Sequence, residues 1–398
     1  YYLFQNDMGR AVRLGEMWKK LYPQNEEPYR ILGLIYQITG QIDNLETNWK
    51  EGYDAGHKGG FLLNLGNIYS EQGEFDKALK YFEEFQQLYP DKAGEIRQLG
   101  TLYMNQGDFD KAIEYFDNQL LVDDNNVQNH LDISTAYLKK GDFSNAEKSI
   151  DNALKKSKSA QDSVTAMTYL TNYYYNRGMA DKYLETDQER IAVFSTVAPP
   201  VMIDAQYYNY NSIKRYKDCG ALELIQQKHG EIVKNIDMGN INFACIIQVN
   251  VGIATQDGEL MTKSMEECSD DLKVGGTATQ MIMIEGFRDL YSGNYESALQ
   301  NMQLFSDTTG LPRHALATVM AEIYNSLEDY DESIDILNEA YKLDSSNPEI
   351  QVLFAKAYLG KGNKSKAKES LDRAFNIWSD ADSDFVPLIE AQQLLQEI

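Results

Sequence analysis

Three segments of the sequence decide the fold: residues 66–78 read GNIYSEQGEFDKA, residues 100–112 read GTLYMNQGDFDKA and residues 134–146 read STAYLKKGDFSNA. Each segment begins 34 residues after the one before it, and all three keep a small residue, Tyr, Gly, Phe and Ala at matching places. Five matching columns in three copies are not expected by chance. The chain therefore contains an internal repeat, and this period indicates units that pack on their neighbours.

Each copy consists of two helical patterns joined by a turn such as Gly73-Glu74-Phe75-Asp76. Glycine permits the left-handed conformation that ends the first helix, and the acidic residue suits the positive end of the second. The pattern resembles the tetratricopeptide repeat family. The residues that carry the resemblance are Leu65-Gly66, Tyr69, Ala78, Phe82 and Tyr89-Pro90. It implies an all-α fold, a right-handed superhelical solenoid of antiparallel helix pairs with a C-terminal capping helix.

Small side chains predict where the helices of a pair approach most closely. We expect Gly66 and Ala78 to lie at the crossing, because a small residue there lets the two backbones come together. Aromatic side chains such as Phe82 would fill the space around them. A large residue at either small position would overpack the contact.

The repeat pattern predicts three parts of the chain. Residues 1–197 would form an N-terminal array of a leading half repeat and five repeats, and residues 244–398 a C-terminal array with a capping helix. Residues 198–243 would form an irregular helical unit with a bend at Pro199-Pro200, because two adjacent prolines cannot continue a helix. This middle unit is longer than one repeat and requires an insertion.

The sequence predicts specific features in two of the later units. In residues 244–278 the turn is expected at Gly258, which places Lys263 in the column that elsewhere holds alanine. The C-terminal helix is expected to begin at Ser383 or Asp384, which are residue types that cap helix N-termini.

Composition limits the classes of partner. The chain has 37 basic and 61 acidic residues and a formal net charge of -24. Such a charge keeps an elongated protein soluble and argues against nucleic acid or an anionic membrane as the main partner. The longest apolar run, residues 243–254, is too short to span a bilayer, so no membrane insertion is expected in this segment.

The sequence offers no arrangement typical of an enzyme. Asp380, Asp382 and Asp384 imitate the start of a calcium loop, but Phe385 and Ala391 stand where the loop needs glycine and glutamate. The four histidines have no metal-binding spacing, and no phosphate loop or dinucleotide motif is present. We therefore expect no catalytic, cofactor-binding or metal-binding residues and no cofactor.

The three cysteines form an odd number without a C-x-x-C spacing. This pattern indicates neither a disulfide framework nor a zinc site. We interpret Cys219, Cys245 and Cys268 as buried thiols.

The family resemblance implies that the first helix of each pair lines a concave groove, which would bind a protein or peptide. The candidate groove residues are Arg30, Leu34, Asn64, Asn67, Arg97, Gln98, Thr101, Asn105, Thr135, Lys139, Tyr169, Asn172 and Tyr175. Some family members hold a peptide's C-terminal carboxylate with a clamp of Lys, Asn, Asn, Lys and Arg. Only Arg30 and Asn64 stand at matching places here, which disfavours that mode.

Three functions are compatible with these patterns. The first is a non-enzymatic protein-protein interaction scaffold. The second is the regulatory or sensory tail of a larger bacterial signalling protein of the kinase or cyclase type, because Tyr2 and Ala11 fit repeat columns and the sequence would thus begin inside a repeat. The third is a solenoid that binds a glycan or small molecule through tyrosines near Pro199-Pro200. The compartment, cytoplasmic or periplasmic, and the oligomeric state are left open.

Overall fold

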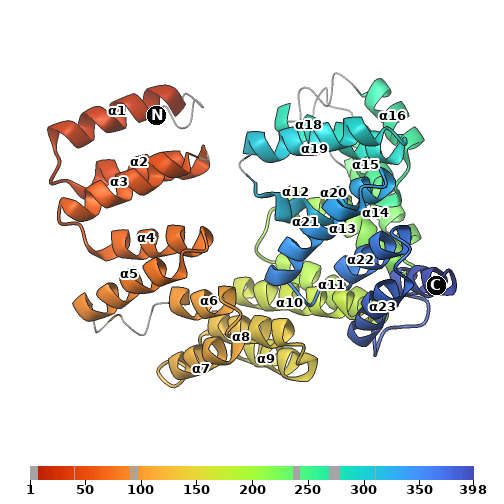
Figure 1. The fold of residues 1–398 in the computed structure, drawn as a ribbon, viewed down its shortest axis with the longest axis horizontal. Coiled ribbons are helices and arrows are strands. Elements are labelled where there is room, and N and C mark those ends of the chain that lie inside the picture. The colour runs from red at the N-terminus through yellow and green to blue at the C-terminus, as the bar shows by residue number, and fades with distance from the viewer. Residues whose placement is uncertain are drawn as a thin grey trace. The chain divides into compact units, whose positions relative to one another are not determined.

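The structure, a computed structural model, describes residues 8–39, 41–89, 92, 97–235, 243–268, 278–309 and 311–398. Every regular element among them is helical, and the helices follow one another in pairs (Figure 1), which confirms the predicted all-α solenoid. The chain divides into two units, Tyr1–Tyr137 and Leu138–Ile398. We describe each unit by itself, and the predicted division near residues 197 and 243 stays a prediction.

Unit 1 contains the first two strong repeats, most of the first helix of the third, and the units before them. Within it α2 packs on α3, α4 on α5 and α6 on α7. The last helix runs three residues past the boundary of the unit. The helices are α1 (Met8–Leu21), α2 (Glu26–Ile38), α3 (Ile42–Asp54), α4 (Gly59–Glu71), α5 (Phe75–Leu88), α6 (Arg97–Asn105), α7 (Phe109–Leu120) and α8 (Val127–Lys140).

Unit 2 continues the array to the C-terminus. Its helices are α9 (Phe143–Lys156), α10 (Ala160–Asn176), α11 (Ala180–Phe194), α12 (Pro200–Tyr208), α13 (Tyr210–Asp218), α14 (Leu222–Asn235), α15 (Phe243–Thr255), α16 (Gly258–Glu267), α18 (Ala278–Tyr291), α19 (Tyr295–Thr309), α20 (Ala317–Ser326), α21 (Tyr330–Leu343), α22 (Pro348–Gly360), α23 (Lys364–Ile377) and α24 (Val386–Gln396), with a 3-10 helix, η2 (Arg313–Leu316). No helix of the described residues combines the length and the apolar character needed to cross a bilayer.

The turns inside the strong repeats have the predicted geometry. Gly73, Gly107 and Gly141 have φ angles of 75°, 78° and 79°, a region that favours glycine. The side chains of Asp108 and Asp142 cap α7 and α9 by accepting from backbone N–H groups, at 3.3 Å and 3.2 Å. Local sequence thus fixes where each helix pair reverses.

The closest approach of paired helices involves a glycine and an aromatic ring. A Cβ atom on Gly66 would lie 2.4 Å from Cε1 of Phe82, and one on Gly100 would lie 2.3 Å from Cζ of Phe116. Both rings are fully buried, and so are Ala78 on α5 and Ala112 on α7. The expected crossing is confirmed, and the ring itself occupies the space that glycine leaves.

The Pro199-Pro200 pair separates two helices, as expected. Pro199 caps α12 and Pro200 is its first residue. The helix pair α13 and α14 follows, with the left-handed Gly220 (φ 70°) at its turn. The insertion that the sequence required is therefore α12, a short additional helix placed before an ordinary pair.

The predicted register of residues 244–278 is wrong. Gly258 is the first residue of α16, and the left-handed turn residue before it is Gln256, with a φ of 58°. In the strong repeats the alanine is the fourth residue of the second helix, as Ala78 is in α5. The fourth residue of α16 is the fully buried Met261, whereas Lys263 is exposed. The error arose because glutamine takes a conformation that the pattern assigned to glycine. Residues 269–277 of this predicted unit lie outside the described residues.

The cysteine prediction is also wrong for two of the three residues. Cys245 on α15 and Cys268 after α16 form a disulfide, with their Cα atoms 5.7 Å apart. Cys219 remains a buried free thiol, as expected. Sequence spacing could not show the pairing, because it depends on the way α15 and α16 pack.

The C-terminal segment returns to the turn between α10 and α11. Arg177 is 3% exposed, and its guanidinium donates to the carbonyl oxygen of Ile377 and pairs with Asp380. The backbone N–H of Asp382 donates to the carbonyl oxygen of Gly178 at 3.0 Å, and its carboxylate accepts from the N–H of Asp181 at 3.1 Å. These contacts join residues about 200 positions apart and close unit 2 on itself.

The start of α24 differs from the prediction. Its N-cap is Phe385, which is 2% exposed and forms no side-chain capping hydrogen bond. Ser383 and Asp384 therefore do not begin the helix, because the buried Phe385 ring fixes the chain here instead.

Among the described residues, no group of three or more side chains is placed to hold a metal ion.

Replacing Arg177 with methionine is expected to lower the free energy of unfolding by about 1–3 kcal/mol, because the buried carbonyl of Ile377 would lose its donor. The matched control is Arg373→Met, since Arg373 is half exposed and pairs along α23 with Glu369, and such surface pairs contribute roughly 0–1 kcal/mol. Urea unfolding of both variants measures the difference. Equal destabilisation would show that Arg177 does not close unit 2.

Candidate functional site

Unit 1 carries a hollow of about 290 Å³ between α4 and α6. It is lined by Asn67, Ser70, Arg97, Gln98, Thr101 and Asn105. All except Ser70 are among the residues that the sequence proposed for a groove. Ser70 accepts a hydrogen bond from Asn105 Nδ2 at 3.3 Å, which joins the two helices across the hollow.

A buried carboxylate on α8 holds the arginine of this hollow. The side chain of Asp132 is 3% exposed, whereas that of Arg97 is 50% exposed. Arg97 Nη2 donates to Asp132 Oδ1 at 2.7 Å, and Gln128 Nε2 donates to the same oxygen at 3.0 Å. The guanidinium is thus fixed in orientation and largely neutralised, so the hollow is polar rather than strongly charged.

The other unit 1 candidates lie outside this hollow. Arg30 is exposed and pairs with Glu27 at 2.8 Å, and Leu34 is 46% exposed. Asn64 is half-buried on α4. Thr135 donates to the carbonyl oxygen of Leu131 at 3.0 Å.

The unit 2 candidates have separate surroundings. Lys139 is half-buried, burial lowers the pKa of its ammonium, and its backbone carbonyl accepts from Ser345 at 2.9 Å. Tyr169 is half-buried, and Asn172 accepts from Arg215 at 2.7 Å. Tyr175 alone among them lines the pocket described next.

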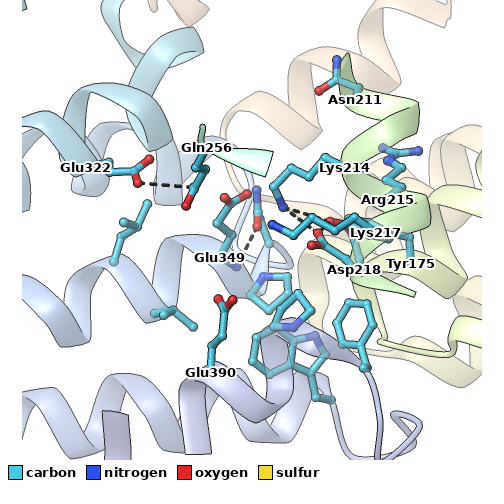
Figure 2. A pocket seen from close by; sticks show the side chains of 18 of the residues that line it. Tyr175, Asn211, Lys214, Arg215, Lys217, Asp218, Gln256, Glu322, Glu349 and Glu390 are labelled. Carbon is cyan, nitrogen blue, oxygen red and sulfur yellow. Dashed lines mark hydrogen bonds and ion pairs between the residues drawn. The ribbon is translucent and has the colours of Figure 1, made fainter. Parts of the chain in front are cut away.

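Unit 2 contains a pocket of about 280 Å³ (Figure 2). Its walls come from α10, α13, α20, α22 and α24, together with Gln256 and Trp378 between helices. Helices far apart in sequence meet here because the C-terminal segment returns to the α10–α11 turn. The pocket is therefore built by the closure of unit 2.

One side of the pocket is formed by basic side chains of α13. Lys214 Nζ donates to Asp218 Oδ2 at 2.8 Å and to Tyr175 Oη at 3.1 Å, while Tyr175 Oη donates to Asp218 Oδ2 at 2.5 Å. Burial raises the pKa of Tyr175 well above its usual value, so its phenol stays protonated. Arg215 and Lys217 also line the pocket and add positive charge to this side.

The other side of the pocket is acidic. Figure 2 shows Glu322, Glu349 and Glu390 across from Lys214 and Lys217. Burial raises the pKa of Glu322, while the nearby Lys356 lowers it and Glu349 raises it further. Gln256 Nε2 donates to Glu322 Oε1 at 3.4 Å. The pocket is thus lined by both negative and positive side chains, with Lys356 close to Glu322.

Aromatic side chains complete the lining. The ring of Phe385 meets the rings of Tyr175 and Trp378 edge to face, with centroids 5.8 Å and 6.0 Å apart. Trp378 is 5% exposed, and its indole Nε1 has no hydrogen-bond partner within the described residues. Of the residues that line this pocket, the sequence predicted only Tyr175 as a site residue. A signal for the others was present, because Lys214, Arg215 and Lys217 form a basic cluster in an acidic chain.

The paired helices define a helical-repeat protein. Tetratricopeptide repeat sequences match residues 61–92, 96–127 and 325–377 of the chain. The chain thus contains tetratricopeptide repeats in both units. These repeats support a role as a protein-protein interaction scaffold.

The chain is also similar to solved structures at low identity. A tetratricopeptide repeat protein from Parabacteroides merdae has 15% identity, covers 68% of this chain and 98% of its own, and gives a TM-score of 0.38. The APC/C hetero-tetramer Cut9-Hcn1 has 14% identity, covers 99% of this chain and 94% of its own, and gives a TM-score of 0.36. The P58(IPK) TPR domain has 14% identity, covers 100% of this chain and 96% of its own, and gives a TM-score of 0.26. No curated protein matches the sequence.

Proposed function

We propose that this protein is a non-enzymatic scaffold that binds an extended segment of a partner protein in the hollow of unit 1. The observation that carries the proposal is the meeting of Asn67, Gln98, Thr101 and Asn105 with Arg97 in one hollow of about 290 Å³. These residues come from the first helices of two consecutive repeats. Such positions are repeated along the array, which suits a partner that extends along it.

The chemistry of the hollow favours recognition of a main chain. Carboxamide groups both donate and accept hydrogen bonds, so Asn67 and Gln98 match the alternating N–H and C=O groups of an extended peptide. Arg97 is already paired with Asp132. Binding should therefore depend on hydrogen bonds more than on net charge, and should weaken little as salt increases.

The test uses peptides selected from a random phage-displayed library against the full chain. Asn67→Ala with Gln98→Ala is expected to weaken the selected peptides by about tenfold or more, because each lost hydrogen bond contributes roughly 0.5–1.5 kcal/mol. The matched control is Gln87→Ala with Asn118→Ala, which removes two exposed amides from the second helices α5 and α7. Isothermal titration calorimetry gives the affinities.

Two results would contradict the proposal. Selection of no peptide would remove peptide capture as the function of this surface. Equal loss of affinity in the Asn67→Ala, Gln98→Ala variant and in the control variant would exclude the hollow as the binding site. Circular dichroism of each variant verifies that the helices are intact.

A further inference from the structure

The three carboxylates of the unit 2 pocket come from three different helices. Glu322 lies on α20, Glu349 on α22 and Glu390 on α24. Glu349 and Glu390 are exposed, and Glu322 is half-buried. Like charges gathered around one cavity repel one another, and a cation placed between them would relieve that repulsion. Lys356, which also lines the pocket, and Lys214 offset part of the repulsion at Glu322, and a bound cation would offset more of it.

The basic side of the pocket has one lysine without a carboxylate partner. Lys214 is neutralised by Asp218, and Arg215 is held by Asn172 and lies 4.9 Å from the centroid of the Tyr175 ring. Lys217 Nζ lies 3.5 Å from the carbonyl oxygen of Ala254 and, within the described part of the chain, forms no ion pair. An anionic group that enters the pocket would meet this ammonium.

Aromatic surfaces lie between the two charged sides. The rings of Tyr175, Phe385 and Trp378 form the aromatic part of the lining, and the buried indole N–H of Trp378 lacks an acceptor within the described residues. Buried Trp N–H groups in proteins usually donate a hydrogen bond. The volume of about 280 Å³ suits a small molecule better than a helix or a folded partner.

We infer that the unit 2 pocket binds a small zwitterion of the amino acid or dipeptide class. Its ammonium group lies toward Glu349, Glu322 and Glu390, and its carboxylate lies toward Lys217. Its side chain lies toward the apolar part of the lining, which includes Val352 and Leu353. This inference does not rest on the proposed peptide groove, because the two sites lie in different units and share no residue.

Binding is tested by calorimetry and thermal shift on the full chain with four probes: phenylalanine, leucine, glycyl-phenylalanine and glycyl-leucine. At least one probe should bind and raise the unfolding temperature, since a ligand that binds the folded state stabilises it. The N-acetylated and the C-amidated forms of that probe should each bind about tenfold more weakly or worse, because each lacks one charge-assisted interaction. Succinate and 1,4-diaminobutane test for an anion site or a cation site alone.

Variants locate the site. Glu349→Gln and Lys217→Gln should each lower the affinity for the zwitterion by about tenfold. Glu339→Gln and Lys155→Gln, both exposed on second helices, should leave it unchanged. Comparison of phenylalanine amide with N-acetyl-phenylalanine assigns the ends: Glu349→Gln should weaken only the amide, and Lys217→Gln only the acetylated form.

Several outcomes would overturn the inference. These are no binding by any of the four probes, equal binding of the blocked and unblocked forms, tighter binding of succinate or diaminobutane, or equal effects in the control variants. The variant Asn67→Ala with Gln98→Ala should bind the zwitterion normally. The failure of one site is thus distinguishable from the failure of the other.

Discussion

Replacing Phe116 with alanine is expected to lower the free energy of unfolding by about 3–5 kcal/mol, because this fully buried ring fills the centre of the α6–α7 pair. Replacing Gly100 with alanine is expected to cost about 1–3 kcal/mol for the opposite reason, since a Cβ atom there would lie 2.3 Å from the same ring. The two substitutions therefore act on one contact, from its two sides.

A double-mutant cycle separates this contact from helix propensity. In the Phe116→Ala background the ring is gone, so Gly100→Ala should be neutral or stabilising by up to about 1 kcal/mol, the usual helix preference of alanine over glycine. Gly230→Ala is the matched control, because Gly230 lies within α14 and a Cβ atom there meets nothing within 4 Å. Urea unfolding gives each free energy. An equal cost of Gly100→Ala in both backgrounds would show that the ring is not responsible.

Reduction of the Cys245–Cys268 disulfide is expected to lower the free energy of unfolding by about 2–4 kcal/mol. The bond joins residues 23 positions apart, and this cross-link restricts the unfolded chain. Urea unfolding with and without a phosphine reductant measures the loss. In the variant Cys245→Ala with Cys268→Ala, the reductant should have no effect, which separates reduction from other actions of the reagent.

Alkylation under denaturing conditions counts the thiols independently. Without reductant, iodoacetamide should modify one cysteine, Cys219, and after reduction it should modify all three. Mass spectrometry of the intact chain reads the result. Modification of three cysteines before reduction would contradict the disulfide.

The sequence predicted the fold best where local packing repeats. The three strong repeats within residues 59–160 have glycine at the turn inside each helix pair, and the first two also have a buried aromatic ring on the second helix. Both features act within one helix pair. The prediction failed where another residue type does the work of glycine. Gln256, with a φ angle of 58°, is the left-handed turn residue, and the pattern placed the turn two residues too late, at Gly258.

The two candidate sites differ in the same way. Asn67 and Gln98 were predictable because their distance from the repeat columns fixes the face of the helix on which they lie. Lys217, Glu349 and Glu390 were not, because they meet only after unit 2 closes, and the closure depends on the burial of Arg177 against the C-terminal segment. The additional helix α12 also shifts the register between these residues and the strong repeats.

The contact between Arg177 and the segment around Ile377 also restricts how this protein can evolve. Tandem-repeat genes commonly change length by duplication or deletion of whole units, and an open array accepts such changes with little strain. In unit 2 an extra helix pair between residues 182 and 376 would carry the C-terminal segment away from the turn that receives it. Unit 2 is therefore expected to keep a fixed number of helix pairs, while single residues around its pocket remain free to vary.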